Sequence, residues 1–470
     1  MDHNFGAGDY RLIHFEVEVT AATMKARKAI LGFGITGQSV ARYLLARGEN
    51  PVVLDTRPAK PIDEEFSQLE IHWQCNVWPE KVLPHTATVI VSPGLPLGNC
   101  LLEQARSSGL TVISDIDLFF DNVTAPVIGV TGTNGKSTVV SLVGHILRSA
   151  GYKCAVGGNL GEAALDLIDN KIDFYVLELS SFQLEHSRSL PLARSVILNI
   201  TEDHVDHHGS VRNYVAAKQK ILADAKSWIY SREDASTQGA DFAAMVSFGL
   251  DKSAAQDAWG IALEHGQEWV FRGELAICAS ANLPLQGRHN VLNCMAAMAL
   301  VESWVEPSSV VSHIGDFQGL AHRFQAVAEI AGVAFVNDSK ATNVGSTKAA
   351  LDGLERKANV VLIAGGDAKG ADLQTLADSL TGRVKRLVTL GKDGPGIGVL
   401  ADQCGIAHVA VASIEDAVTA AVQDVAAGDM VLLSPACSSL DMFDNFQQRG
   451  EVFARAVGAL TVADLPAVQA

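Results

Sequence analysis

The segment GTNGKST, residues 132–138, combines glycines, a lysine and hydroxyl side chains at a spacing suited to phosphate binding. It follows the apolar run PVIGV and precedes a helical pattern. A glycine loop between strand and helix points backbone N–H groups at phosphate oxygens, and the helix N-terminus adds positive potential. Lys136 would place a charge on the transferring phosphate, and Ser137 or Thr138 could ligate Mg²⁺. We therefore predict an ATP site rather than a chance glycine turn, although G-x-x-G-K-S is shorter than the usual P-loop spacing.

Carboxylate, amide and imidazole groups follow the next two apolar runs. Glu178 and Ser180 end the first run; the second ends in Asn199, Glu202, Asp203 and His204. Such groups beside an ATP loop suit Mg²⁺ held between phosphate oxygens and protein ligands. Lys218, in the helical segment RNYVAAKQKIL, would by itself be interpreted as a solvated helix lysine.

The stretch EDHVDHH also offers a transition-metal site through His204, His207 and His208. Imidazole is a common ligand of such metals. His207 and His208 lie further into a polar turn, however, and we expect both to be solvated. We therefore favour the magnesium interpretation, in which His204 is the only one of the three histidines that acts as a ligand.

The motif GFGITG, residues 32–37, follows another apolar run, and Asp55 ends the run after it. This pattern is typical of a dinucleotide site with the acidic side chain on a ribose hydroxyl. The same geometry accepts any diphosphate, including that of a UDP-sugar, and glycines at such a turn can also be purely structural. The motif alone leaves these alternatives open.

Short β-rich runs alternate with helical patterns along the whole chain, which indicates parallel α/β sheets with crossover helices. Ligands of such sheets bind beyond the carboxyl ends of the strands. The runs are KAILGFG, PVVLDT, ATVIVSPG, APVIGVTG, FYVLELS, SVILNI, VAFVNDS, NVVLIAGG, RLVTLG and MVLLSP, and their polar ends include Asp55, Thr131, Glu178, Asn199, Asp338, Gly366 and Ser434.

The chain has 470 residues, enough for three domains at roughly 150 residues each. We place boundaries near Asp117 and Leu320, which gives domains 1–116, 117–320 and 321–470. Residues 1–23 precede the first convincing strand and are expected to be an extension, with Met24 as an alternative start.

The composition excludes several classes of protein. Hydrophobic residues make up 48% and the net charge is −17, so a large core is expected and a basic nucleic-acid-binding surface is not. No apolar run approaches the ~18 residues that span a bilayer, and the N-terminus lacks a secretory pattern. The seven cysteines have no zinc-like spacing. We expect a cytoplasmic, monomeric protein with reduced thiols and no nucleic-acid or membrane partner.

Together these motifs resemble the Mur ligase family from about Lys28 to the C-terminus. The blocks that carry the resemblance, in order, are GTNGKST, GGNLG, LELSSFQLE, LNITEDHVDHH, YVAAK, AHRF and NDSKATN. Within the family, DSKATN, GGDAKG and SPACSSLDMFDNFQQRG resemble the members that add D-glutamate. The 23-residue extension and a shortened turn between His204 and Lys218 depart from the pattern.

The resemblance implies a Rossmann-like N-terminal domain for the UDP moiety, a central P-loop ATPase-like domain and a Rossmann-like C-terminal domain for the amino acid. It favours UDP at GFGITG, and the implied contacts are Ile35, Thr36, Asp55, Thr56, Arg57 and Ser92, with Asn159 positioning the muramoyl group. The implied ATP contacts are Gly132, Thr133, Asn134, Gly135, Lys136, Ser137, Thr138, Asn293, Arg323 and Asp338.

Two Mg²⁺ ions are implied as well. Ser137 and Glu178 would hold the first; His204 and a carbamylated Lys218, formed with CO₂, would hold the second. Lys340 and Arg323 join Lys136, His204 and Lys218 as catalytic residues, and the implied D-glutamate contacts are Thr342, Lys369, Ser439 and Phe446.

The implied activity is an ATP-dependent ligation of D-glutamate to UDP-N-acetylmuramoyl-L-alanine through an acyl phosphate, in peptidoglycan precursor synthesis. Alternatives are a ligase for another amino acid, a folylpolyglutamate synthetase-like enzyme, an NAD-dependent dehydrogenase and a non-catalytic nucleotide-binding protein. The dehydrogenase would leave GTNGKST, Glu178 and Lys218 without a role.

Overall fold

The computed structural model describes residues 27–239, 245–253, 255–285 and 287–466. The predicted N-terminal extension and Met24 lie outside this range. The described residues form two compact units, which are divided between Ile113 and Ser114. Within the described ranges, no helix has both the length and the apolar character required to cross a bilayer.

The first unit contains one sheet with the strand order β3-β2-β1-β4-β5. The pairs of β1 with β2 and β4, and of β2 with β3, are parallel. Parallel strands need crossover connections, and helices supply them here. The elements are β1 (Arg27–Leu31), α1 (Ile35–Leu45), β2 (Val52–Leu54), η1 (Glu64–Phe66), β3 (Glu70–His72), η2 (Leu83–His85), β4 (Thr86–Val91), α2 (Cys100–Ser107) and β5 (Thr111–Ser114).

The second unit begins with a nine-stranded sheet of order β14-β13-β12-β11-β10-β9-β6-β8-β7. Its strands are β6 (Val127–Thr131), β7 (Cys154–Gly158), β8 (Phe174–Glu178), β9 (Arg194–Ile197), β10 (Trp228–Ser231), β11 (Met245–Phe248), β12 (Ala258–Glu264), β13 (Gln267–Arg272) and β14 (Leu275–Ala279). The associated helices are α3 (Asp115–Phe120), α4 (Lys136–Ser149), η3 (Ala164–Leu167), α5 (Ser181–His186), α6 (Val205–His208), α7 (Val211–Gln219), η4 (Lys220–Leu222), η5 (Ala235–Thr237), η6 (Ser280–Asn282), α8 (Arg288–Val301) and α9 (Val310–Ile314).

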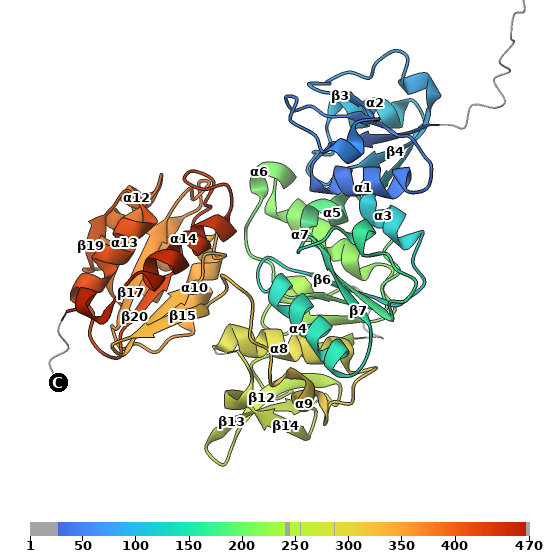
Figure 1. Ribbon diagram of the computed structural model, residues 1–470. Coiled ribbons are helices and arrows are strands. Elements are labelled where there is room, and N and C mark those ends of the chain that lie inside the picture. The colour runs from blue at the N-terminus through green and yellow to red at the C-terminus, as the bar shows by residue number, and fades with distance from the viewer. Residues whose placement is uncertain (1–26, 240–244, 254, 286, 467–470) are drawn as a thin grey trace, which may run out of the picture. The chain divides into compact units, whose positions relative to one another are not determined.

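Helices α4 and α8 pack side by side against this sheet, as Figure 1 shows. All five residues of β6 are buried, as expected for a parallel strand covered on both faces. The core formed here includes Val130, Val139, Ile146 and Met295, each fully buried. It holds the strand–loop–helix segment around the phosphate motif rigidly in place.

The second unit also contains a six-stranded sheet of order β15-β16-β20-β17-β18-β19. Its strands are parallel except β15, which pairs antiparallel with β16. The elements are β15 (Gln325–Ile330), β16 (Val333–Asn337), α10 (Val344–Asp352), β17 (Val360–Gly365), η7 (Leu373–Leu376), α11 (Ala377–Leu380), β18 (Val384–Leu390), α12 (Gly394–Gln403), β19 (Ala407–Ala410), α13 (Ile414–Ala421), η8 (Val422–Asp424), β20 (Met430–Leu433), α14 (Phe446–Gly458) and η9 (Val462–Asp464).

The predicted α/β class is confirmed, and the described residues form three sheets. The sequence patterns did not indicate the antiparallel ribbon β12–β13–β14. Its first turn contains His265 at φ 51° and Gly266 at φ 81°. Two successive positive φ values match the type I′ turn that joins twisted antiparallel strands.

Candidate active site

The phosphate motif forms the turn between β6 and α4. Gly132 and Gly135 have φ values of 152° and 85°, which glycine adopts far more readily than other residues. Gly135 is the N-cap of α4 and has no side chain to occupy the first turn. The unpaired backbone N–H groups of that turn are therefore available to an anion.

Asn199, at the end of β9, holds this loop from the side. The Thr133 N–H donates to the Asn199 backbone oxygen at 2.8 Å, and the Asn134 N–H donates to Asn199 Oδ1 at 2.9 Å. Thr133 Oγ1 also lies 3.0 Å from the hydroxyl of Tyr214 on α7. These bonds fix the loop conformation before any ligand binds.

Lys136 folds back over the loop that precedes it. Its Nζ donates to the backbone oxygens of Gly132 and Thr133 at 2.9 and 2.8 Å. Burial lowers the pKa of Lys136, whereas the nearby Glu178 carboxylate opposes that shift. The ammonium group is thus held at the position where a phosphate on the loop would meet it.

A carboxylate lies next to the first turn of α4. Ser137 Oγ donates to Glu178 Oε2 at 2.5 Å, and Asn159 Nδ2 donates to Glu178 Oε1 at 2.9 Å. Burial would raise the pKa of Glu178, but Lys136 and these two hydrogen bonds hold it below its ordinary value. An anionic Glu178 beside a serine hydroxyl has the donor atoms that Mg²⁺ prefers.

Lys218 is only 2% exposed, so the interpretation of a solvated helix lysine is wrong. Its Nζ donates to the Gly132 backbone oxygen at 2.9 Å and to Thr131 Oγ1 at 3.4 Å. Burial lowers the pKa of Lys218 well below its usual range, and the Lys136 charge adds to that shift. His204 is in the left-handed conformation, φ 51°, at the N-cap of α6, and it lines the same cavity as Lys218.

Three side chains from the segment that follows residue 320 complete the charged set. Arg323 Nη2 donates to Ser137 Oγ at 2.5 Å. Asp338 accepts from Ser434 Oγ at 2.8 Å, and burial raises the pKa of Asp338 to about 7. Burial, and then the charge of Arg323, lower the pKa of Lys340 to about 8.

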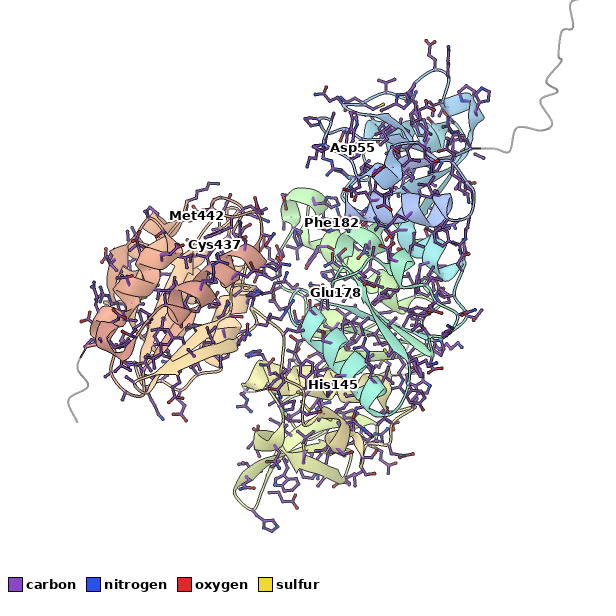
Figure 2. All side chains as sticks on the ribbon, viewed as in Figure 1. Asp55, His145, Glu178, Phe182, Cys437 and Met442 are labelled. Atoms are coloured by element: carbon purple, nitrogen blue, oxygen red, sulfur yellow. The ribbon has the colours of Figure 1, made fainter. Side chains whose placement is uncertain are left out.

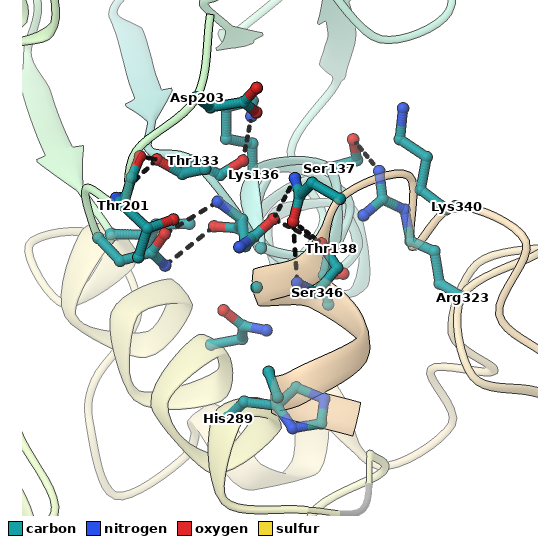
Figure 3. A pocket seen from close by; sticks show the side chains of 18 of the residues that line it. Thr133, Lys136, Ser137, Thr138, Thr201, Asp203, His289, Arg323, Lys340 and Ser346 are labelled. Carbon is teal, nitrogen blue, oxygen red and sulfur yellow. Dashed lines mark hydrogen bonds between the residues drawn. The ribbon is translucent and has the colours of Figure 1, made fainter. Parts of the chain in front are cut away.

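These groups line one cavity of about 810 Å³ (Figure 3). Figure 3 shows Lys136, Ser137 and Arg323 turned toward this space, with the hydrogen bond between Ser137 and Arg323 dashed. The cavity brings together the predicted residues Thr133, Asn134, Gly135, Lys136, Ser137, Thr138, Asn159, Glu178, His204, Lys218, Asn293, Arg323, Asp338, Lys340 and Thr342.

The remaining predicted residues of the second unit lie outside the lining. Gly132 contributes its backbone oxygen from behind the loop. Phe446 begins α14, and its ring centroid is 4.0 Å from Lys340 Nζ, so it adjoins the cavity through that lysine. Lys369 follows β17 with φ 52°, and Ser439 is buried after β20; neither lines the cavity.

The first unit has its own pocket, of about 290 Å³, at the GFGITG turn. All six residues implied for the UDP moiety line it: Ile35, Thr36, Asp55, Thr56, Arg57 and Ser92. Asp55 accepts from the Phe33 N–H at 2.6 Å and from Arg57 Nη2 at 2.6 Å. Burial would raise the pKa of Asp55, but its bond to Arg57 holds it below the usual value.

Several lining residues belong to no sequence motif. Ser346 Oγ donates to Asn134 Oδ1 at 2.7 Å, and His289 also faces the cavity. The GTNGK motif had indicated Asn134, but its partner lies 212 residues away and has no motif of its own. The expectation that His207 and His208 are solvated is wrong, because the side chains are 11% and 0% exposed under Phe182 and Glu185.

Three family models match successive parts of the chain. The model described as the Mur ligase MurD-like N-terminal domain matches residues 26–114. The Mur ligase middle domain matches residues 130–301, and the Mur ligase glutamate ligase domain matches residues 322–437.

Among curated proteins, the chain is similar to ligases named UDP-N-acetylmuramoylalanine–D-glutamate ligase. The Shewanella violacea protein is 41% identical over 93% of this chain and 96% of its own length. The Legionella pneumophila protein, strain Philadelphia 1, is 40% identical over 92% of this chain and 98% of its own length. The Shewanella oneidensis protein is 42% identical over 90% of this chain and 96% of its own length.

Solved structures share the fold at lower identity. UDP-N-acetylmuramate-alanine ligase MurC from Thermotoga maritima aligns with a TM-score of 0.59 at 19% identity, over 92% of this chain and 99% of that one. MurF from Acinetobacter baumannii aligns with a TM-score of 0.58 at 18% identity, over 91% and 92%.

Proposed function

Because the chain belongs to the Mur ligase family, we propose that it joins D-glutamate to UDP-N-acetylmuramoyl-L-alanine and cleaves ATP to ADP and phosphate. The observation that carries the proposal is the identity of about 40% to ligases of that name over 90–93% of the chain. The buried anionic and cationic groups around one cavity provide an independent chemical reason for phosphoryl transfer.

The triphosphate of ATP is proposed to lie on the first turn of α4, with Lys136 at the γ-phosphate. The supporting geometry is the open helix N-terminus after Gly135 and the ammonium held over the loop. Asn293, Arg323 and Asp338 are assigned to the adenine, phosphates and ribose. Arg323 adds a second cation beside Ser137, where negative charge accumulates during transfer.

The donor set fits two Mg²⁺ ions. Ser137 and the anionic Glu178 are proposed to hold one; His204 and a modified Lys218 are proposed to hold the other. When bound, the ions would neutralise phosphate charge and align the reacting oxygens.

We propose that Lys218 is carbamylated, and its surroundings support this modification. An unmodified ammonium would repel a metal ion, and the described residues place no carboxylate within ion-pair distance of Lys218 Nζ. A lowered pKa makes the free amine, which is the form that reacts with CO₂, more abundant. The resulting carbamate is an anion that could bind Mg²⁺ beside His204.

The acceptor is proposed to bind through its UDP group in the pocket of the first unit, at the six residues named above. Asn159, fixed by its bond to Glu178, is assigned to the muramoyl group. Thr342, Lys369, Ser439 and Phe446 are assigned to D-glutamate.

The chemistry must convert an unreactive carboxylate into an acyl donor. The L-alanine carboxylate oxygen attacks the γ-phosphorus, and ADP leaves with the electrons of the broken P–O bond. The amine of D-glutamate, after losing a proton, attacks the acyl phosphate; phosphate leaves and the amide forms. Lys136, Arg323 and Lys340 stabilise the negative charge of both steps.

We further propose that the domains comprise residues 1–116, 117–320 and 321–470, and that the enzyme acts as a cytoplasmic monomer. The three separate sheets and the break between the compact units at residues 113 and 114 support the domain division.

The decisive experiment measures ADP release with UDP-N-acetylmuramoyl-L-alanine and a panel of amino acids. We expect ADP release with D-glutamate and little ADP release with L-glutamate, L-alanine, L-lysine or another diamino acid. Release that depended on another amino acid, or on a folate acceptor, would contradict the proposal. Hydride transfer from a nicotinamide cofactor without ATP would contradict the assignment of both pockets.

A further inference from the structure

Beyond the phosphate-binding cavity, two histidines and a glutamate converge between α5 and α6. His207 Nε2 lies 2.8 Å from Glu185 Oε2, and His208 Nδ1 lies 3.5 Å from Glu185 Oε1. One ligand atom from each of the three residues lies within 4.8 Å of the other two. The proposed ligase chemistry uses none of them.

The cluster is almost closed to solvent. The side chain of His208 is fully buried, and those of His207 and Glu185 are 11% and 13% exposed. The Phe182 ring stacks on His208 at 5.5 Å between centroids and meets the His207 ring edge-on at 4.3 Å. A carboxylate placed this deep needs a positive partner, because burial of an uncompensated charge is costly.

One ring nitrogen in this group has no hydrogen bond. His208 Nε2 lies 3.0 Å from Ser181 Oγ, whereas the buried Nδ1 has no hydrogen-bond partner. If Nε2–H donates to Ser181, the lone pair of the neutral ring resides on Nδ1, which lies 3.5 Å from Glu185 Oε1. An outer hydrogen bond of this kind is the usual way in which a metal-binding histidine is oriented.

Backbone hydrogen bonds also hold the two histidines in place. The N–H groups of His207 and His208 donate to the His204 backbone oxygen at 3.1 and 3.0 Å. Asn213 Nδ2 on α7 donates to the His208 backbone oxygen at 2.8 Å. Figure 1 shows α5, α6 and α7 gathered in this region, and Figure 2 labels Phe182 there.

We propose that Glu185, His207 and His208 bind one divalent transition-metal ion, separate from the Mg²⁺ ions at the phosphates. Two imidazoles and a carboxylate suit Zn²⁺, Co²⁺ or Ni²⁺ better than Mg²⁺, which prefers oxygen ligands. Ligands about 2.1 Å from a tetrahedral ion are about 3.4 Å apart. The two separations from Glu185, 2.8 and 3.5 Å, are close to that value, and all three donor atoms lie within 4.8 Å of one another. The ion would join α5 to the turn that begins at His204.

The test uses the full chain, stripped with chelator and dialysed against Zn²⁺ in excess Mg²⁺, which is added to fill the proposed Mg²⁺ sites. We expect one Zn²⁺ per chain by elemental analysis and a higher unfolding midpoint with Zn²⁺. Co²⁺ in place of Zn²⁺ should give visible absorption bands of nitrogen and oxygen coordination. His207→Gln and Glu185→Gln should each lower the Zn²⁺ affinity by a factor of about 10 or more.

Two controls separate this site from other histidines. His145 Nε2 lies 2.9 Å from Asp316 Oδ1, so His145→Gln removes an equivalent histidine–carboxylate pair elsewhere and should leave Zn²⁺ binding unchanged. His204→Ala should also retain the ion. Loss of Zn²⁺ in His204→Ala but not in His207→Gln would overturn the proposal, as would a wild-type chain that folds normally and binds no Zn²⁺.

Discussion

Lys218 Nζ donates to the backbone oxygen of Gly132 at 2.9 Å, across 86 residues of sequence. This bond places an amine of lowered pKa directly behind the phosphate loop. We expect ¹³C-bicarbonate to produce a carbamate resonance by NMR that is absent from Lys218→Ala. That variant should lose most Mg²⁺-dependent turnover while keeping its fold by circular dichroism. Full activity of the wild-type protein in the absence of bicarbonate and CO₂ would exclude the carbamate.

Lys136→Ala should lower turnover by a factor of about 10³ or more, because it removes a cation positioned for the transferring phosphate. The measurement is ADP release at saturating substrates. Lys226→Ala provides a comparison for removal of a lysine from the same unit outside the cavity lining, and should be close to wild type. Phosphate release at the wild-type rate from Lys136→Ala would refute the assigned role.

Gly135→Ala should weaken ATP binding ten-fold or more. A methyl group there would lie 2.5 Å from Asn293 Oδ1, and the φ of 85° adds strain of about 1 kcal/mol. Gly151→Ala is the matched control, because it has φ 93° but no atom within 4 Å of the added methyl group. Calorimetric titration with an ATP analogue distinguishes the two; equal affinities would argue against a phosphate site at this loop.

The pH dependence of kcat/KM for D-glutamate should report Lys340. Its pKa of about 8 leaves the side chain charged below pH 8 and neutral above it. Attraction to an anionic substrate or intermediate is therefore present at lower pH and is lost as the pH rises through 8. Lys340→Arg retains the charge and should move this alkaline limb upward. If the alkaline limb of the pH profile is unchanged in Lys340→Arg, the limb reports the titration of another group.

Thiol reactivity should follow burial. Burial raises the pKa of Cys154 and Cys278 to about 11 and that of Cys294 to about 12, so few thiolates form at pH 8. Cys100 is exposed and should react first with a thiol reagent in the native protein. Cys100→Ser should remove the fast phase, whereas Cys278→Ser should leave it intact.

Local patterns predicted much of the site because its groups lie at strand ends. Glu178 ends β8, Asp55 follows β2, and GTNGKST bridges β6 and α4. The buried face of α7 also leaves a signal in the sequence: Tyr214, Ala217 and Lys218 follow helical spacing and are all buried. A lysine on the buried face of a helix is not expected to be solvated.

The sequence by itself indicated many of the parallel strands, the phosphate loop and most candidate ligands, because these depend on neighbours within a few residues. Only the tertiary structure decided that Lys218 lies behind the loop, that Ser346 pairs with Asn134 and that His208 is buried beside Glu185. Each of these depends on segments far apart in the chain, and the periodicity of one segment does not specify which other segment will cover it.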